Sequence, residues 1–447
     1  MTSVSGIEAE NLTAPIPVVT GRPRWRDTAI ALRSYNYRMY VIGQLFANTG
    51  GWMARIAIDW LVLELTGNVA LVGIVVALQF APTIVLGAWA GVLSDRANRH
   101  RVLIATQTVG LVSNALLAVL VLLGAVEVWH VFLVAATTGV AMAIDGPSRS
   151  AFVSEMVGTS RLRNAISVNA MIFHLGGLLG PAISGVLIVA VGSGWSIAIN
   201  AAAAGVALTM LLVMRVHELH RAPRQARGGG QIREALAYAR RKPTILWPIV
   251  LLGFVAVFGM NLPVLFTAAA TTFGTGAAGY GLYSSLAAVG ALVGAVLSAQ
   301  RRSLRLRAIV IATIGYGLVT VLAGVAPWYP LFLGALVGIG ITRLLFATGA
   351  ESMTQLSTNP GIRGRIMSFY FMVVVGGQAL GGAIMGFIAE HFGPHIAFTV
   401  AGGVPALAGI TIAIVLARRH QLRIRVSLRT PRRLVRIVPR GQSILEG

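Results

Sequence analysis

Six charged residues lie inside stretches of sequence that are otherwise almost wholly apolar. They form two pairs four residues apart and one wider pair: Arg55 and Asp59, Asp145 and Arg149, and Arg343 and Glu351. A charge at the centre of a bilayer costs about 2.5 to 3.5 kcal/mol on insertion scales, so six charges facing lipid would cost over roughly 15 kcal/mol. We therefore expect these side chains to border a shared aqueous cavity.

The first apolar stretch also carries a polar stripe. Its members recur at spacings of four, seven and four residues, which fall on one face of a helix: Gln44, Asn48, Arg55 and Asp59. A polar stripe on an otherwise apolar helix indicates a wet surface. The alternative is that the Arg and Asp of each close pair only neutralise one another within a helical turn.

Coupling to a proton gradient needs a carboxylate whose pKa differs between two conformations. Asp59 and Asp145 lie deep in their stretches, whereas Glu351 lies nearer to an end. We hypothesise that Asp59 is the coupling site and is partnered alternately by Arg55 and by substrate or a proton. The seventh stretch contributes Asn261 as a further polar candidate.

The elements that must position these residues are helices that cross a membrane. About 20 apolar residues span the hydrocarbon core, and the chain contains twelve such stretches in two groups of six. Their approximate bounds are residues 38–64, 70–92, 102–124, 130–152, 166–191 and 195–214, then 244–270, 279–300, 308–327, 330–352, 366–389 and 395–417.

Arginine is distributed unevenly between these stretches. The even-numbered gaps hold the basic residues, whereas the odd-numbered gaps contain Glu64, Glu127 and Glu390 but no Arg or Lys. Because basic loops remain in the cytoplasm, the pattern predicts a multi-pass protein of the bacterial inner membrane with both termini cytoplasmic.

The pattern divides the chain into five parts. They are a cytoplasmic tail (1–35), a first six-helix bundle (36–214), a cytoplasmic linker with an amphipathic helix (215–243), a second bundle (244–418) and a basic cytoplasmic tail (419–447). We expect the basic tail to lie on anionic lipid headgroups.

Composition excludes several classes of protein. The chain is 56% hydrophobic, more than one soluble core could bury, and its net charge of +22 is spread over short loops and tails rather than one nucleic-acid-binding surface. It has no cysteine for disulfides or thiolate metal sites and no glycine-rich phosphate loop. We expect no enzyme activity, cofactor or metal, and an ion gradient as the energy source.

The two halves of the chain repeat one another. The segment from Gly177 to Gly185 aligns with that from Gln378 to Gly386 at an offset of 201 residues, and both read as small residues in a fifth helix. Two six-helix halves built on one plan are typical of membrane transporters.

The loop after the second stretch resembles the loop motif of the major facilitator superfamily, G-x-L-x-D-R-x-G-R followed by two basic residues. The matching residues are Gly91, Asp95, Arg96, Arg99 and Arg101, with Asn98 and His100 as departures. The resemblance implies a charged latch at the cytoplasmic face, in which Asp95 accepts hydrogen bonds from a neighbouring helix N-terminus.

The fifth stretch is similar to the antiporter motif of the drug and proton exchange branch of that family. It contains Gly176, Gly180, Pro181 and Gly185, with Ser184 where glycine is usual. Small residues four apart let helix backbones approach closely, and a proline lets the helix bend. We interpret the motif as a site of helix packing and a hinge, and the resemblance favours an exporter over an importer.

The resemblance implies an all-α membrane protein with 12 transmembrane helices in two pseudo-symmetric bundles, in which helices one, four, seven and ten line the cavity. The cavity candidates are then Gln44, Asn48, Arg55, Asp59, Asp145, Arg149, Asn261 and Arg343. The expected function is export of an amphiphilic drug or siderophore in exchange for protons, by a monomer surrounded by lipid. The alternatives are a proton-coupled importer, a lipid or lysolipid flippase of the same fold, and a sensor that transports nothing.

Overall fold

The computed structural model describes residues 16–17, 30–219, 231–300, 303–359, 362–419, 422–426 and 435–439. Nearly all of these residues are helical. The first half contains η2 (Ile30–Arg33), α2 (Tyr35–Thr66), α3 (Val69–Arg96), α4 (Arg99–Leu122), α5 (Val128–Val191), α6 (Ser193–Leu212) and η3 (Val216–Glu218). The second contains α7 (Gln231–Arg241), α8 (Pro243–Phe254), η4 (Val255–Gly259), α9 (Leu262–Thr272), α10 (Gly276–Ala299), α11 (Leu306–Gly324), α12 (Tyr329–Leu356) and α13 (Arg363–Arg419).

Four short strands form two antiparallel pairs outside the helices. Strand β1 (Ile16–Pro17) pairs with β2 (Ser303–Leu304), and β3 (Leu422–Val426) pairs with β4 (Val435–Pro439). The prediction of an all-helical membrane fold is confirmed. Most of the two predicted tails and the glycines at 228–230 lie outside the described residues.

The described helices fit the expected twelve spans once two long helices are divided. Helix α5 breaks at Gly158 (φ 69°) and α13 breaks at Gly393 (φ 80°), and both positive φ angles suit glycine. Ten described helical segments are long and apolar enough to cross a membrane. Helix α2, with its polar stripe, is not among them, although about half of its residues are buried in the bundle.

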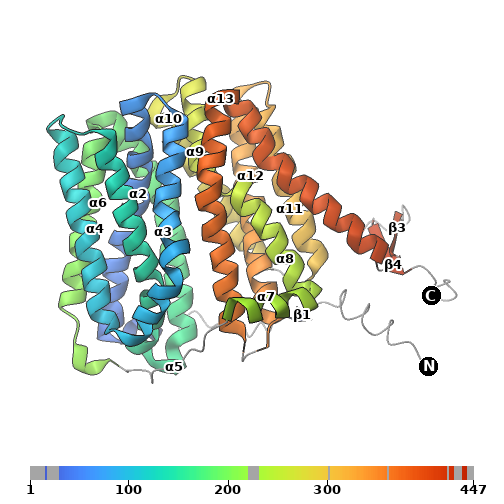
Figure 1. Cartoon of the computed structure of the whole chain (residues 1–447), viewed down its shortest axis with the longest axis horizontal. Helices are drawn as coiled ribbons and strands as arrows, with labels where there is room; N and C mark the ends of the chain where they lie inside the picture. Colours follow the sequence, from blue (N-terminus) through green and yellow to red (C-terminus); the bar gives the residue numbers. More distant parts are fainter. Residues whose placement is uncertain are drawn as a thin grey trace.

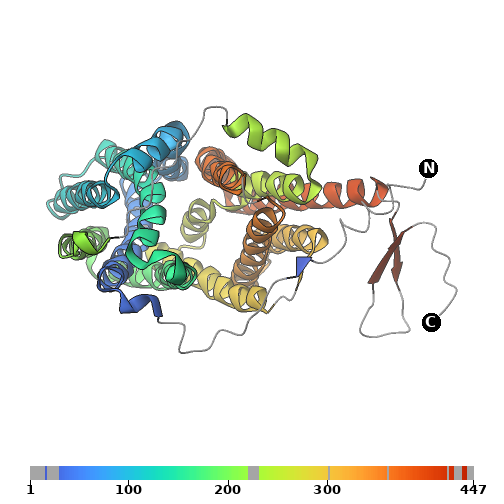
Figure 2. The same ribbon diagram turned by 90° about the horizontal axis from the view of Figure 1, so that it is seen from below.

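The helices form two side-by-side groups (Figure 1). Helices α2 to α6 make the first half and α8 to α13 the second, and Figure 2 shows both groups from the α7 side. Because successive helices run in opposite directions, the turns at Gly67, Gly192 and Gly393 lie at one end of the molecule, which we name the Gly67 end. The opposite end, along which α7 lies, is the linker end.

Each half repeats one packing arrangement between its first and fifth spans. In the first half, a Cβ at Gly180 would lie 2.5 Å from Trp52 Cβ of α2, and one at Gly176 would overlap the Asn48 amide. In the second half, a Cβ at Gly381 of α13 would overlap the Val257 carbonyl oxygen of η4. The internal duplication therefore appears as matched close contacts between backbones.

Glycines also make the seam between the halves. Helix α5 meets α10 where a Cβ at Gly281 would lie 2.7 Å from the Gly185 Cα, and α3 meets α13 where a Cβ at Gly386 would lie 3.0 Å from the Gly73 Cα. All four glycines lie in the turns of helix nearest the Gly67 end. The two halves are thus in backbone contact at that end.

The linker helix α7 is docked on the second half. Lys242, the only lysine in the chain, directs its ammonium group to the Ser357 carbonyl oxygen (3.3 Å) and to the Asn359 side chain (3.4 Å) at the end of α12. The Tyr238 hydroxyl accepts a hydrogen bond from the Asn359 backbone N–H (3.3 Å). Helix α7 is therefore fastened to the second half.

Substituting alanine for Gly381 is expected to destabilise the protein by about 1 to 3 kcal/mol, because the added methyl group overpacks a backbone contact. Thermal unfolding of the detergent-purified protein measures the change. Gly334→Ala in α12 is the matched control, since no atom lies within 4 Å of its Cβ position. Equal unfolding temperatures for the two variants would contradict the role given to Gly381.

Candidate functional site

A charged network lies inside the first half, between α2, α4 and α5. Arg149 donates two hydrogen bonds to the Asp145 carboxylate, from Nε to Oδ2 (2.6 Å) and from Nη2 to Oδ1 (2.8 Å). It donates a third to Oε1 of Gln44, and Thr106 of α4 donates to Asp145 Oδ1 (2.9 Å). Asp145, Arg149 and Gln44 therefore form one connected group, with Thr106 as a member that the sequence patterns did not indicate.

A small, partly open space of about 10 Å³ lies beside this network. It is lined by Tyr40, Gly43, Gln44, Gln107, Arg149, Ala207, Met210 and Leu211. This volume holds about one water molecule. This space is therefore too small for a molecule larger than water.

Asp59 is fully buried at the seam between the halves. Its Oδ2 accepts a hydrogen bond of 2.9 Å from the hydroxyl of Tyr280, which belongs to α10 of the other half. Its Oδ1 is buried without a hydrogen-bond partner among the described residues. A buried, half-satisfied carboxylate is costly to maintain, so Asp59 stays a candidate for a functional role.

Arg55 lies one turn before Asp59 but does not form an ion pair with it. Among the described residues, the ion pairs within 4.0 Å do not include one between these two side chains. The Arg55 guanidinium instead lies over the rings of Phe80 (4.7 Å) and Trp52 (5.8 Å). Cation–π contacts of this kind hold a charge at a low-dielectric site without neutralising it.

The two candidate asparagines bond to backbone. Asn48 donates from Nδ2 to the Ile172 carbonyl oxygen of α5 (2.8 Å). Asn261 is buried and donates to the Val257 carbonyl oxygen (2.9 Å), at the break between η4 and α9. Asn48 therefore links the first and fifth spans. The hydrogen bond of Asn261 lies within the seventh span, where its amide also packs against Gly381 of α13.

Arg343 and Glu351 remain apart from the other charges. Glu351 accepts a hydrogen bond from Gln355 (3.2 Å) in the same helix. Arg343 has neither a carboxylate partner within 4.0 Å nor a hydrogen bond among the described residues. The eight cavity candidates thus fall into separate groups, and no bond within the described part of the chain joins one group to another.

The loop motif after α3 is described in part. Arg99 forms an ion pair with Glu155 of α5, and Asn98 accepts hydrogen bonds from the His100 and Arg101 backbone N–H groups (3.1 and 3.4 Å), which begins α4. Arg101 is exposed. Gly91, Asp95 and Arg96 belong to α3, and their side chains lie outside the described residues.

The segment from Gly176 to Gly185 contacts both halves. Gly176 and Gly180 face α2 of their own half, whereas Gly185 faces Gly281 of the other. The buried Ser184 hydroxyl donates to the Met53 carbonyl oxygen (2.9 Å) and also contacts the Ser196 hydroxyl (2.8 Å). A serine in place of the usual glycine therefore links the first, fifth and sixth spans.

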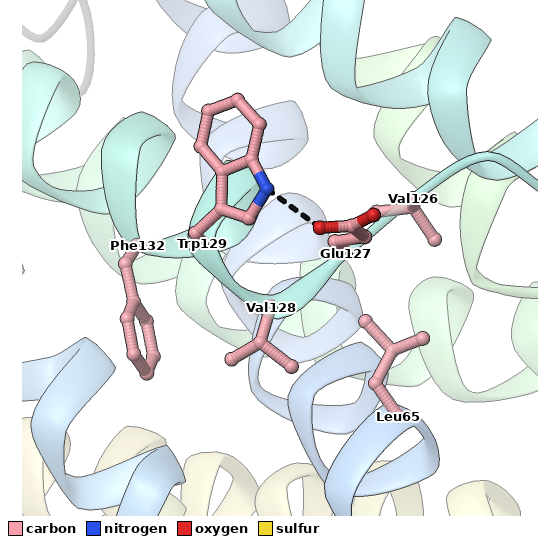
Figure 3. A pocket seen from close by; sticks show the side chains of 6 residues that line it. All are labelled: Leu65, Val126, Glu127, Val128, Trp129 and Phe132. Atoms are coloured by element: carbon pink, nitrogen blue, oxygen red, sulfur yellow. Dashed lines mark hydrogen bonds between the residues drawn. The ribbon is translucent and has the colours of Figure 1, made fainter.

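A shallow depression of about 580 Å³ opens on the outer surface of the first half at the Gly67 end (Figure 3). It is lined by Leu65, Val126, Glu127, Val128, Trp129 and Phe132. The Trp129 indole N–H donates to Glu127 Oε2 (2.7 Å), and tryptophan is enriched where helices leave the membrane. None of the six charged residues inside the apolar stretches lines this depression.

Two related helix bundles, with charged residues inside membrane-length helices of both and a seam between them at one end, are typical of a multi-span membrane transporter. A family model described as a transmembrane secretion effector matches residues 28–437. The chain belongs to the major facilitator superfamily.

Sequence relatives include exporters of siderophores. The chain is 25% identical over 371 residues to the enterobactin exporter of Citrobacter koseri, covering 81% of this chain and 84% of the relative. It is 26% identical to the enterobactin exporter of Shigella flexneri, covering 81% and 83%. A third match, 28% identical, is to the staphyloferrin A transporter of Staphylococcus aureus and covers 31% of this chain and 35% of that protein.

Solved structures share the fold. A D-xylose-proton symporter superimposes with a TM-score of 0.66 at 15% identity, covering 85% of this chain and 96% of that one. A bacterial homologue of the lysosomal transporter Spinster, in an inward-facing and occupied conformation, gives 0.65 at 16% identity, covering 86% and 95%. The predicted fold is therefore confirmed.

Proposed function

We propose that this protein exports an amphiphilic small molecule of the siderophore or drug class across the cytoplasmic membrane by alternating access, in exchange for protons. Family membership and the exporters among its relatives support transport of a small molecule. The observation that carries the proposal is the buried carboxylate of Asp59, hydrogen-bonded across the seam. A carboxylate at a contact between moving halves can link proton binding to their movement.

The proposed orientation follows from the arginines. We place the linker end, with Arg99, Arg101 and α7, in the cytoplasm, and the Gly67 end on the opposite side. Both termini are then cytoplasmic. With this orientation, the backbone contacts at the Gly67 end support an inward-facing arrangement, in which the halves are closed on the outside.

The proposed substrate path runs between the halves from the linker end. Arg55 and Arg343, each without a carboxylate partner within 4.0 Å among the described residues, are the groups we assign to an anionic part of the substrate. Asp59 is the proposed proton site. Gln44, Asp145 and Arg149 form the wall of the first half in this proposal. Asn48 holds α2 against α5, and Asn261 lies at the break in the seventh span.

Transport is tested by reconstituting the protein in proteoliposomes that contain a pH-sensitive dye. Addition of a catecholate siderophore or a cationic drug is expected to cause proton movement opposite to the substrate, at a rate that saturates with concentration. Proton movement in the same direction as the substrate would indicate an importer. Substrate movement independent of an imposed pH gradient would contradict proton exchange.

A further inference from the structure

Two hydrogen bonds join the halves through carboxylates at the Gly67 end. In the first, Tyr280 of the second half donates to Asp59 of the first (2.9 Å). In the second, the backbone N–H of Val69, at the start of α3 in the first half, donates to Oε2 of Glu390 in α13 of the second (2.6 Å). Each half thus supplies one carboxylate acceptor and one hydrogen-bond donor to these contacts.

The Glu390 contact has an electrostatic component as well. Val69 is the first residue of α3, where N–H groups lack helical partners and the helix dipole is positive. The Asn68 side chain accepts from Ala70 and Leu71 (2.8 and 3.3 Å) and leaves the Val69 N–H to Glu390. A carboxylate of one half therefore completes the capping of a helix in the other.

The Tyr280 contact is buried and fixed on several sides. The Tyr280 ring packs against Trp60 at 6.4 Å between centroids, and its hydroxyl is also in contact with Thr267 of α9. The charged and titratable groups that act on Asp59 are Arg55 on its own helix and Tyr280 on α10. The single O–H donor of Tyr280 is therefore used by its hydrogen bond to Asp59.

We infer that Tyr280 and Glu390 are gate residues that hold the Gly67 end closed, and that this end opens by breaking both bonds. The glycine contacts at 73, 185, 281 and 386 allow the halves to touch, and the two carboxylate bonds keep them there. The inference rests on the proposed function, because a gate at this end has a purpose only in alternating access. Because Asp59 accepts the Tyr280 hydrogen bond, a proton that binds to Asp59 would act directly on this gate bond.

Because the chain contains no cysteine, a single introduced cysteine can report whether the gate is open. Val76 of α3 is 2% exposed and lies against Gly382 of α13 at the seam. In Val76→Cys, a maleimide that cannot cross membranes, added outside spheroplasts, reaches the thiol only when the Gly67 end opens. The initial alkylation rate therefore reports the population of the open state.

Adding Tyr280→Phe or Glu390→Ala to Val76→Cys is expected to raise the alkylation rate about tenfold, which corresponds to about 1.4 kcal/mol in the opening equilibrium. Glu390→Gln, which keeps an acceptor oxygen but loses the charge, should have a smaller effect. Glu390 is exposed, so its variants should keep the fold even if Tyr280→Phe does not.

Two controls match these variants. Tyr283→Phe removes a buried hydroxyl from the same helix, but one that bonds Thr275 and Tyr329 within the second half. Glu127→Gln removes a carboxylate at the same end whose partner is Trp129 of its own half. Both should leave the rate within about twofold, well below the tenfold step that 1.4 kcal/mol represents.

An unchanged rate in Tyr280→Phe and Glu390→Ala, or an equal increase in the controls, would overturn the gate. If the alkylation rate increased in only one of the two variants, the residue changed in the other would not be part of the gate. The measurement needs neither substrate nor a pH gradient, so it can succeed when the export assay fails and fail when that assay succeeds.

Discussion

Replacing Asp59 with asparagine is expected to abolish transport driven by a pH gradient while leaving the amount of folded protein unchanged. Asparagine is isosteric and its carbonyl oxygen still accepts the hydrogen bond from Tyr280, so packing at the seam is kept. The asparagine side chain, however, cannot bind and release a proton as a carboxylate does. Gradient-driven flux in proteoliposomes should therefore fall to the level of empty vesicles.

Two further measurements separate a coupling defect from general damage. Exchange of labelled for unlabelled substrate, without a gradient, should persist in Asp59→Asn because the halves still move. Glu64→Gln is the control variant, since Glu64 lies on the same helix and bonds Trp60 (2.7 Å) within the first half. Normal gradient-driven efflux in Asp59→Asn would remove Asp59 from the mechanism.

Removing one partner of the Asp145–Arg149 pair should cost roughly 3 kcal/mol of stability, the lower end of the range for breaking a buried ion pair. The two side chains are 18% and 17% exposed, so some water remains near the orphaned charge. Asp145→Ala leaves Arg149 with the neutral Gln44 as an acceptor and without a carboxylate partner among the described residues. The thermal unfolding temperature of the detergent-purified variant measures the loss.

The double variant Asp145→Ala with Arg149→Met tests whether the loss comes from an unpaired charge. It should be more stable than Asp145→Ala alone, because no charge is left buried. Arg215→Ala breaks an ion pair to Glu218 whose members are 55% and 40% exposed, and it should cost less than about 1 kcal/mol. A double variant less stable than either single variant would show that the pair contributes by other means.

Local patterns were sufficient for the fold. Apolar length, the alternation of arginine and the repeat at 201 residues predicted related bundles of membrane helices, because each signal is read over one span or one loop. The seventh span was predicted only as one apolar stretch at 244–270. It is interrupted between η4 and α9, and Pro263, which lacks a backbone N–H, was the visible signal.

Pairings across the molecule were not predictable in the same way. A polar stripe shows that one helix face meets polar atoms, but it does not say whether those atoms are water or a neighbouring backbone. Asn48 lies on the stripe and bonds the backbone of α5. Tyr280 is 221 residues from Asp59 and sits in a helix of small apolar residues, so no periodic signal marked it. Glu390 was visible only as an acid in an odd-numbered gap.

The second part of α5 is packed on α2 of its own half at Gly180 and meets the opposite half at Gly185, close to one end of the helix. In the alternating-access proposal, the Gly185 contact is the fulcrum for this helix and for the half to which it belongs. With a rise of 1.5 Å per residue, the arm from Gly185 back to Gly158 is about 40 Å long. A tilt of a few degrees at the fulcrum, too small to separate two glycines, therefore sweeps the far tip through several ångströms.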